Sequence, residues 1–422
     1  MKRKGFLFDN ITDMDNLRLG FWKAQKGKSA KSDVIEFRRG LDHRLSQISK
    51  ALSENTYPFG QYHYFTIYDP KRRVICAASF AERVIHHAIM NICAADFENY
   101  QIPYSFACRK NKGTFAAVKQ AAQYQKQFKW FLKLDMRKYF DSIDHNILFS
   151  KIQCVYKDPH LLNLFWQIID SYHSSDDKGL PIGNLTSQYF ANHYLSFADK
   201  QAIEKLRIPA YIRYMDDILL WANDRNELME KGLQLESFIK EHLKLNLKPF
   251  VLNRVEHGLP ALGFLFFPKT IRLSSRTKKR YISKTGKYTG DLNNNRISET
   301  EYAQRFLSAY SFIAHANSKG FARKVLQNGL NAESSNRVNR GGSWNNNATN
   351  AAVSNRNNNT PGNSNNNLGF RLACSTKQSF DFEQAFTSFP LHEGKNKASR
   401  PVSSNCRKTD GILIKYALHE EK

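Results

Sequence analysis

Three aspartates stand beside apolar segments, in a pattern suited to holding metal ions. Asp135 ends the segment WFLKLD, and Asp216 and Asp217 interrupt the segment AYIRYMDDILLWA. Adjacent aspartates are usually solvated turn residues, but apolar β-type runs on both sides favour carboxylates held at the end of a buried hairpin. Carboxylate oxygens are the ligands that Mg²⁺ prefers, and two such ions about 3.5–4 Å apart can neutralise both oxygens of a phosphoryl transfer. The aspartates therefore predict a centre that binds two Mg²⁺ ions.

The segments around these aspartates alternate between strand and helix patterns. WFLKLD predicts a short buried strand, and AYIRYMDDILLWA predicts a strand, a tight turn and a second strand. Apolar residues follow helical spacing in SFAERVIHHAIMNICAADFE, and Asp144 is expected to cap a helix through NILFSKI. TYPFGQYHYFTIYDPKRR alternates aromatic and polar residues, as a half-buried hairpin does. This order predicts an α+β fold whose sheet carries acidic residues at its turns.

The two ends of the chain differ from this middle part. Between Asp13 and about Glu54, apolar residues recur at three- and four-residue steps with basic residues between them, which predicts a basic helical N-terminal region. After PALGFLFFP the chain becomes basic and then helical through about Leu330. Asn331 to Asn367 contains fifteen asparagines and almost no aliphatic run, so we expect this stretch to be poorly ordered.

The charge of the chain favours a polyanionic partner. The 422 residues carry a formal net charge of +25, and each phosphate neutralised by a lysine or arginine releases counterions. Nucleic acid is the first expectation; an anionic membrane is disfavoured because no run of about 18 apolar residues exists. The start of the chain, MKRKGFLFDN, has too short an apolar run for a signal peptide. We expect a cytoplasmic protein whose six cysteines are free thiols.

With these motifs in order, residues 13 to 270 resemble the reverse transcriptase family, most specifically through YMDD within a hairpin. The resemblance implies an RNA-directed DNA polymerase in which Asp135 and Asp216 are the main Mg²⁺ ligands and Asp217 assists. It also implies that Phe140 lies under the sugar of the incoming nucleotide and excludes a 2′-hydroxyl. Ordinary core packing is the alternative for this phenylalanine.

The resemblance further implies basic side chains that contact the triphosphate. Arg109 and Lys110 stand in YSFACRKNKGTFAA at the place of such contacts. A solvated basic loop is the alternative. Four further residues are weaker candidates for contacts with the template backbone, the phosphates or the leaving pyrophosphate: Lys71, Arg73, Lys112 and Lys248.

The segment IGNLTSQ departs from the QGxxxSP pattern of group II intron and retron enzymes. It resembles the reverse transcriptases of diversity-generating retroelements, whose products carry errors concentrated at template adenines. By this resemblance Ile182, Gly183, Asn184 and Ser187 face the template and Gln188 the incoming deoxynucleotide, and Ile182 is expected to loosen base-pair checking. Neutral drift at a tolerant position is the alternative.

The Asn-rich stretch and the residues that follow it, NRVNRGGSWNNN through LGFRLA, resemble the end of a formylglycine-generating-enzyme-like, C-type-lectin variable domain. Asparagine codons begin with two adenines, so a template for an adenine-directed mutator would be dense in them. The resemblance implies that the frame runs into, or was joined to, the retroelement's template repeat. A low-complexity Asn tract or an RNA-binding tail that uses Arg337, Arg340, Arg356 and Arg371 are the alternatives.

Together these observations predict a right-hand polymerase with five regions. They are a basic helical N-terminal region (1–60), fingers and palm (61–270), a short helical thumb (271–330), the Asn-rich tail (331–373) and an unassigned end (374–422). The resemblance implies template RNA, cDNA and deoxynucleotides as partners, a small basic ring-forming accessory protein, and a bacterial or phage origin. Two other functions stay open: an intron- or retron-type reverse transcriptase, and a non-catalytic RNA-binding or assembly protein. An RNA-dependent RNA polymerase is disfavoured by Phe140.

Overall fold

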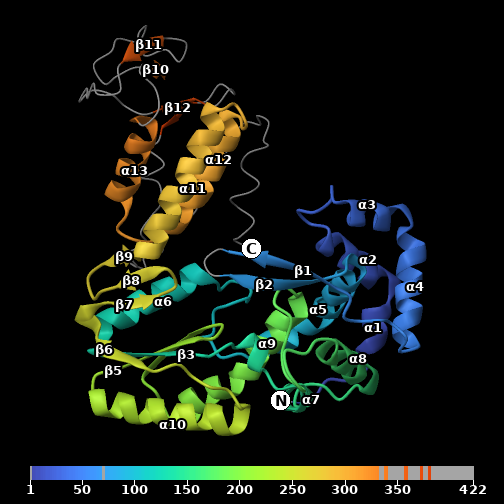
Figure 1. The fold of residues 1–422 in the computed structure, drawn as a ribbon. Coiled ribbons are helices and arrows are strands. Elements are labelled where there is room, and N and C mark those ends of the chain that lie inside the picture. The colour runs from blue at the N-terminus through green and yellow to red at the C-terminus, as the bar shows by residue number, and fades with distance from the viewer. Residues whose placement is uncertain are drawn as a thin grey trace, which may run out of the picture. The chain divides into compact units, whose positions relative to one another are not determined.

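The computed structural model describes residues 2–68 and 72–331, with side chains up to Leu326, and the backbone of four short strands beyond them. It divides into two compact units, Met1–Leu259 with Phe267–Lys269, and Pro260–Phe266 with Thr270–Lys422 (Figure 1). The mixed helix and strand content confirms the predicted α+β class. Most of the predicted Asn-rich tail lies outside the described residues.

Four helices open the first unit and confirm the predicted helical N-terminal region: α1 (Phe8–Thr12), α2 (Met14–Ala24), α3 (Ser32–Arg39) and α4 (Leu41–Ser53). The Asp13 carboxylate caps α2 by accepting hydrogen bonds from two backbone N–H groups. Helix α2 packs against α5 (Phe80–Tyr100). The two helices approach closely at Gly20, where an added Cβ would lie 2.7 Å from the carbonyl oxygen of Val84.

A four-stranded antiparallel sheet forms the other side of this unit, in the order β4, β5, β3, β6. Its strands are β3 (Trp130–Asp135), β4 (Ala210–Tyr214), β5 (Asp217–Ala222) and β6 (Val251–Arg254). The strand and hairpin predicted around the aspartates are therefore present. Strand β5 is apolar and buried from Ile218 to Ala222, which holds it in the middle of the sheet.

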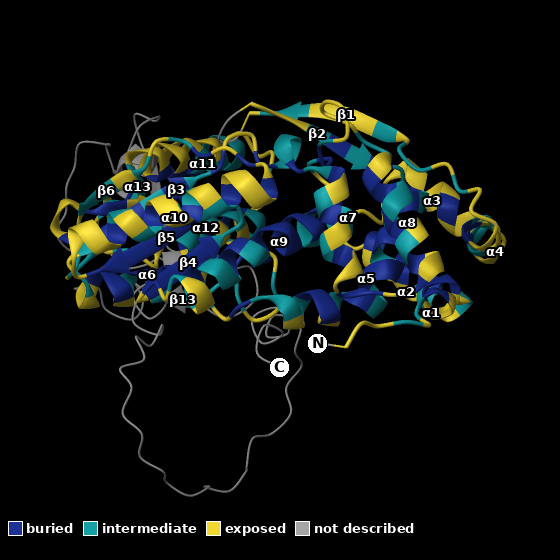
Figure 2. Cartoon of the chain, turned by 90° about the horizontal axis from the view of Figure 1, so that it is seen from below, coloured by how far each residue is buried: buried dark blue, intermediate teal, exposed yellow. Residues whose placement is uncertain are grey.

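The central helix is α9 (Leu185–Lys200), which packs against α5 and α7 and is dark blue along most of its length in Figure 2. A short π-helical turn, Gln201–Lys205, continues it. The other helices of this unit are α6 (Thr114–Gln127), α7 (His145–Gln153), α8 (Pro159–Asp170) and α10 (Arg225–Leu243), with single-turn helices at Phe140–Ser142 and Val255–His257. Asp144 caps α7, as predicted, by accepting a hydrogen bond from Ile147 N.

The aromatic segment before α5 forms the predicted hairpin, with β1 (Tyr62–Ile67) paired to β2 (Arg73–Ala78). The described strands of this hairpin carry three large exposed side chains, Tyr64, Phe65 and Val74. Residues 69–71, and with them the predicted contact Lys71, lie outside the described residues.

The second unit combines a small sheet with three helices. Strands β7 (Leu259–Ala261), β8 (Phe264–Phe266) and β9 (Ile271–Leu273) are followed by α11 (Ser275–Asn293), α12 (Glu299–Ile313) and α13 (Lys319–Asn331). Two antiparallel backbone pairs follow, Arg337–Arg340 (β10) with Arg356–Asn359 (β11) and Arg371–Ala373 (β12) with Ser379–Asp381 (β13). The three helices agree with the helical pattern predicted between residues 271 and 330.

Among the residues that the structure describes, none forms a helix that is both long and apolar enough to span a membrane. The cysteines in the described part, Cys76, Cys93, Cys108 and Cys154, are free.

Candidate active site

The three predicted metal ligands come together at one end of the central sheet. Asp135 and Asp217 end β3 and begin β5, and their Cα atoms are direct cross-strand partners. Asp216 lies in the tight turn between β4 and β5, where Met215 adopts a left-handed backbone with φ of 56°. The apolar register of β3 against β5 therefore brings together carboxylates that lie about eighty residues apart in sequence.

The electrostatics of this cluster favour a bound cation. Burial and the neighbouring carboxylates of Asp217 and Asp135 raise the pKa of Asp216, while the positive charge of Arg73 acts in the opposite direction. Two lysines already stand against the other carboxylates. Lys248 Nζ lies 2.6 Å from Asp135 Oδ2, and Lys133 Nζ lies 3.1 Å from Asp217 Oδ1.

Lys248 is held at the cluster from two sides. Its backbone N–H donates to the Asp135 carbonyl at 2.8 Å, in addition to the ion pair of its side chain. The sequence predicted a contact near the leaving pyrophosphate for this lysine. The structure brings Lys248 into the aspartate cluster itself.

A fully buried ion pair lies beneath the turn that carries Asp216. Arg213 and Asp199 have side chains that are 0% exposed, and Arg213 Nε donates to Asp199 Oδ1 at 2.7 Å. The same guanidinium donates to the Met215 carbonyl at 3.2 Å and to the side chain of Asn192 at 2.9 Å. Burial acts to lower the pKa of Arg213, but the Asp199 carboxylate outweighs it and raises this pKa. The network ties the turn to α9.

Phe140 lies five residues beyond Asp135, in the single-turn helix Phe140–Ser142. It is half-buried and packs against the main core, with its ring centroid 5.6 Å from that of Tyr139. Tyr139 is itself buried and donates its hydroxyl to the Ala191 carbonyl at 2.5 Å. Because Phe140 is partly exposed, core packing and a contact with substrate are both compatible with its position.

The segment predicted to face the template docks on the β1–β2 hairpin. Cys76 N donates to the Ile182 carbonyl at 2.9 Å, and Asn184 Oδ1 accepts from Ala78 N at 3.2 Å. Gly183 has φ of +127°, and a Cβ there would lie 2.8 Å from Ile75 Cγ2. Only glycine adopts this backbone so close to β2 without strain.

The C-terminal part of this segment enters α9. Ser187 is buried in the first turns of the helix, and Gln188 is half-buried beside it. The structure therefore places the predicted template and nucleotide residues on one continuous stretch, from the hairpin contact into the central helix.

The predicted phosphate contacts have different surroundings. The Arg109 guanidinium donates to Glu98 Oε2 at 2.8 Å and to the carbonyls of Ile102 and Ser105. Its N–H groups therefore already form hydrogen bonds within the protein. This differs from the predicted direct contact with a triphosphate. Lys110, by contrast, is exposed.

The two remaining basic candidates also differ. Lys112 Nζ donates to the Pro103 carbonyl at 2.9 Å and lies 5.1 Å from the centroid of the Phe106 ring. Arg73 is exposed at the start of β2 and its charge acts on Asp216. Arg73 and Lys110 are therefore the exposed residues among the predicted cations that the structure describes.

Two residues that the sequence did not single out contribute to the cluster: Arg213 beneath the turn and Lys133 beside Asp217. A signal for Arg213 existed, because a charged residue stands inside the otherwise apolar strand AYIRY. A charge in such a strand predicts a buried partner.

Two family models match this chain. Residues 69–256 match the model described as reverse transcriptase (RNA-dependent DNA polymerase). Residues 299–376 match the model described as sulfatase-modifying factor enzyme 1-like domain, which fits the predicted tail resemblance. The second match also covers α12 and α13, which the sequence alone assigned to the thumb.

The similar curated proteins are intron-encoded. The putative COX1/OXI3 intron 2 protein of Saccharomyces cerevisiae is 25% identical over 191 residues, which is 42% of this chain and 22% of the relative. The group II intron-encoded protein LtrA of Lactococcus lactis subsp. cremoris is 24% identical over 192 residues, 43% of this chain and 32% of the relative. The chain thus spans less than a third of the length of these relatives. A solved telomerase structure from Candida albicans shares 12% identity, with a TM-score of 0.38 over 63% of this chain and 61% of that one, too low to bear on the fold.

Proposed function

We propose that this chain is an RNA-directed DNA polymerase, and specifically the reverse transcriptase of a diversity-generating retroelement, because residues 69–256 match the reverse transcriptase model. It would copy a template-repeat RNA into error-prone cDNA that diversifies a target gene. The observation that carries the polymerase activity is the convergence of Asp135, Asp216 and Asp217 at one end of a buried sheet within the matched segment. The IGNLTSQ segment and the tail support the retroelement assignment.

The donor set of the aspartate cluster fits two Mg²⁺ ions, which we propose as the cofactors. Three carboxylates offer hard oxygen ligands, and Lys248 and Lys133 already occupy the positions where positive charge is favoured. Asp135 and Asp216 would be the main ligands, assisted by Asp217. Bound Mg²⁺ supplies charge neutralisation at the attacking and leaving oxygens.

The protein's own residues contribute position and charge. Lys110 and Arg73 would steady the triphosphate, and Arg109 would hold the loop that presents Lys110. Lys248 would meet the leaving pyrophosphate once a metal ion replaces it at Asp135. Lys71 and Lys112 remain weaker proposals for contacts with the template or the phosphates.

Selection of the sugar is assigned to Phe140, whose ring would clash with a 2′-hydroxyl. The substitution Phe140→Ala should therefore admit ribonucleotides while deoxynucleotides are still used. The measurement is incorporation of single NTPs and dNTPs at a primer end. If the variant and the wild type discriminate equally, Phe140 is a packing residue.

Low fidelity is assigned to the segment that docks on the hairpin. Ile182, Gly183 and Asn184 would lie against the templating base, with Ser187 behind them and Gln188 toward the incoming nucleotide. An apolar Ile182 offers no side-chain donor or acceptor for checking the base pair. The resemblance of IGNLTSQ to the enzymes of diversity-generating retroelements supports errors that concentrate at template adenines.

An accessory partner and the chain's own tail complete the proposal. A small basic accessory protein that forms a ring would help to hold the template RNA, and the Asn-rich tail would be an incidental copy of the template repeat. The net charge of +25 supports an RNA-bound assembly.

The test is primer extension on an RNA template with dNTPs and Mg²⁺, followed by sequencing of the products. The comparison pairs Asp216→Ala with Asp9→Ala, which removes an exposed aspartate on α1. Extension by the wild type and Asp9→Ala, absent in Asp216→Ala, with errors concentrated at adenines, is the expected result. If extension stays absent after the cognate RNA and accessory protein are added, the chain is a non-catalytic RNA-binding or assembly protein.

The alternative function is that of an intron-type reverse transcriptase, which the similarity to two intron-encoded proteins favours. The same assay separates the two. Faithful extension at every template base would favour the intron-type enzyme over the retroelement enzyme.

A further inference from the structure

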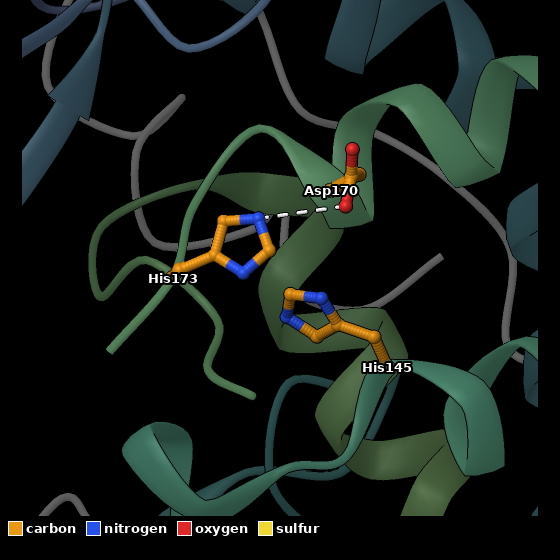
Figure 3. A group of neighbouring side chains, drawn as sticks. All are labelled: His145, Asp170 and His173. Carbon is orange, nitrogen blue, oxygen red and sulfur yellow. Dashed lines mark ion pairs between the residues drawn. The ribbon is translucent and has the colours of Figure 1, made fainter. Parts of the chain in front are cut away.

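A second group of potential metal ligands lies among residues that the polymerase proposal does not use. His145 at the start of α7, Asp170 at the end of α8 and His173 in the following loop point toward one another (Figure 3). Each offers one ligand atom, and these atoms all lie within 4.8 Å of one another. Two imidazoles and one carboxylate differ in kind from the all-carboxylate cluster of the palm.

His145 is arranged as metal-binding histidines usually are. Its side chain is 0% exposed, and Nε2 lies 2.7 Å from the Gly179 carbonyl oxygen. A carbonyl can only accept, so Nε2 carries the proton and Nδ1 carries a lone pair. That Nδ1 is buried and has no hydrogen-bond partner. Metal-binding histidines typically donate their other N–H to a carbonyl in this way, which fixes the tautomer and aims the lone pair at the metal.

Asp170 stands where a carboxylate needs a cation. It is the last residue of α8, whose last turn contains no basic residue. The negative end of the helix dipole disfavours a second negative charge there. His173 Nε2 lies 3.4 Å from Asp170 Oδ1, and both side chains are partly exposed, at 42% and 51%. They can therefore adjust while His145 stays fixed.

We propose that His145 Nδ1, the Asp170 carboxylate and the His173 imidazole bind one divalent transition-metal ion of the zinc type, with a fourth position open to water. Zn²⁺ takes imidazole and carboxylate ligands at about 2.0–2.2 Å, which places tetrahedral ligand atoms roughly 3.3–3.6 Å apart. The Asp170 to His173 separation already matches this spacing. Mg²⁺ prefers an oxygen-only shell and is not favoured by two imidazoles.

The bound ion would fix a loop that leads into the template-facing segment. The loop after α8 is joined to the palm by Gly179 N, which donates to the Ile143 carbonyl at 2.8 Å, and by Leu180 N, which donates to the Phe140 carbonyl at 2.8 Å. His173 lies within this loop, whereas His145 belongs to the palm. A metal ion bound by both histidines would tie this loop to the palm. The loop leads through Gly179 and Leu180 to Ile182.

The experiment is titration of the metal-free full-length chain with Co²⁺, in the presence of excess Mg²⁺ to fill the aspartate cluster. Tetrahedral Co²⁺ absorbs strongly in the visible range, and octahedral Co²⁺ weakly. The test variants are His173→Ala and Asp170→Asn, both at partly exposed positions, and the matched control is His43→Ala on the exposed face of α4. We expect one tetrahedral Co²⁺ per wild-type and control chain, displaced by Zn²⁺, and about tenfold or greater loss of affinity in both test variants.

Thermal unfolding gives a second measurement that does not depend on polymerase activity. Zn²⁺ should raise the unfolding temperature of the wild type and of His43→Ala but not of His173→Ala. The proposal is overturned if the test variants bind Co²⁺ as tightly as the wild type, or if the wild type binds none. It is also overturned if the spectrum shows a thiolate charge-transfer band, because the ion would then sit at a cysteine such as Cys108 or Cys154.

Discussion

Replacing Arg213 by methionine tests the idea that a buried ion pair supports the catalytic turn. The change removes every donor that reaches the Asp199 carboxylate except the hydroxyl of Tyr211. Both charged side chains are 0% exposed, so the Asp199 charge would be left buried and nearly unpaired. Breaking such a pair costs about 3–5 kcal/mol. For a unit of this size, that corresponds to a fall of roughly 6–20 °C in unfolding temperature.

The double variant Arg213→Met with Asp199→Asn separates charge from architecture. It removes the unpaired charge and keeps an oxygen that can accept from Tyr211, so it should recover at least half of the lost stability. It does not restore the donor to the Met215 carbonyl, so the turn that carries Asp216 stays loose. We expect about a tenfold or larger loss of primer-extension rate in this stable variant.

The assays are thermal and urea unfolding of the purified chain, together with single-turnover primer extension. Arg207→Met, at an exposed position, is the control and should change stability by less than about 0.5 kcal/mol. The reasoning is refuted if Arg213→Met is as stable as the control. It is refuted in its functional part if the double variant extends primers at the wild-type rate.

Three other changes test separate parts of the structure. Lys248→Met should alter the free energy of unfolding by less than about 1 kcal/mol, because the ion pair with Asp135 is partly exposed. It should lower the Mg²⁺ concentration needed for half-maximal extension, since an ammonium no longer competes for Asp135. An unchanged Mg²⁺ concentration for half-maximal extension would contradict this. Gly183→Ala places a Cβ 2.8 Å from Ile75 Cγ2 at φ of +127°, so it should lower the free energy of unfolding by about 1–3 kcal/mol and change the error spectrum of the products. Urea unfolding and product sequencing test this prediction. Wild-type values in both measurements would count against the docking of this segment on β2. Burial lowers the pKa of His193 to about 4, so the wild type should lose on the order of 3 kcal/mol of stability as pH falls from about 6.5 to 4, because the unfolded chain then binds more protons. His193→Asn should make the free energy of unfolding less dependent on pH in this range, which urea unfolding at several pH values can measure. An equally steep pH dependence in the variant would refute the assignment.

The sequence predicted the elements of the site better than its side-chain partners. The apolar flanks of Asp135 and of the Asp216–Asp217 pair were enough to predict a strand and a hairpin, because strand patterns are local. The position of Lys248 against Asp135 was not predictable, since it depends on how a distant segment pairs with the end of β3.

Arg109 shows the same limit from the opposite side. Its place in a basic loop predicted a substrate contact, but a helix upstream supplies Glu98 as its partner. Local sequence gives the charge of a side chain and not the group that satisfies it.

The pairing of β3 with β5 has a consequence for how this domain tolerates change. Side chains alternate between the two faces of a strand, so a slip of one residue would turn Asp217 to the opposite face from Asp135. Leu132 and Leu220 are buried and lie opposite each other in the same strand pair, so their packing helps to fix the register that brings Asp135 and Asp217 together. Volume changes in this core that shift the register would silence the site without touching an acidic residue. Insertions should be tolerated in the loops that flank β3 but not between Trp130 and Asp135.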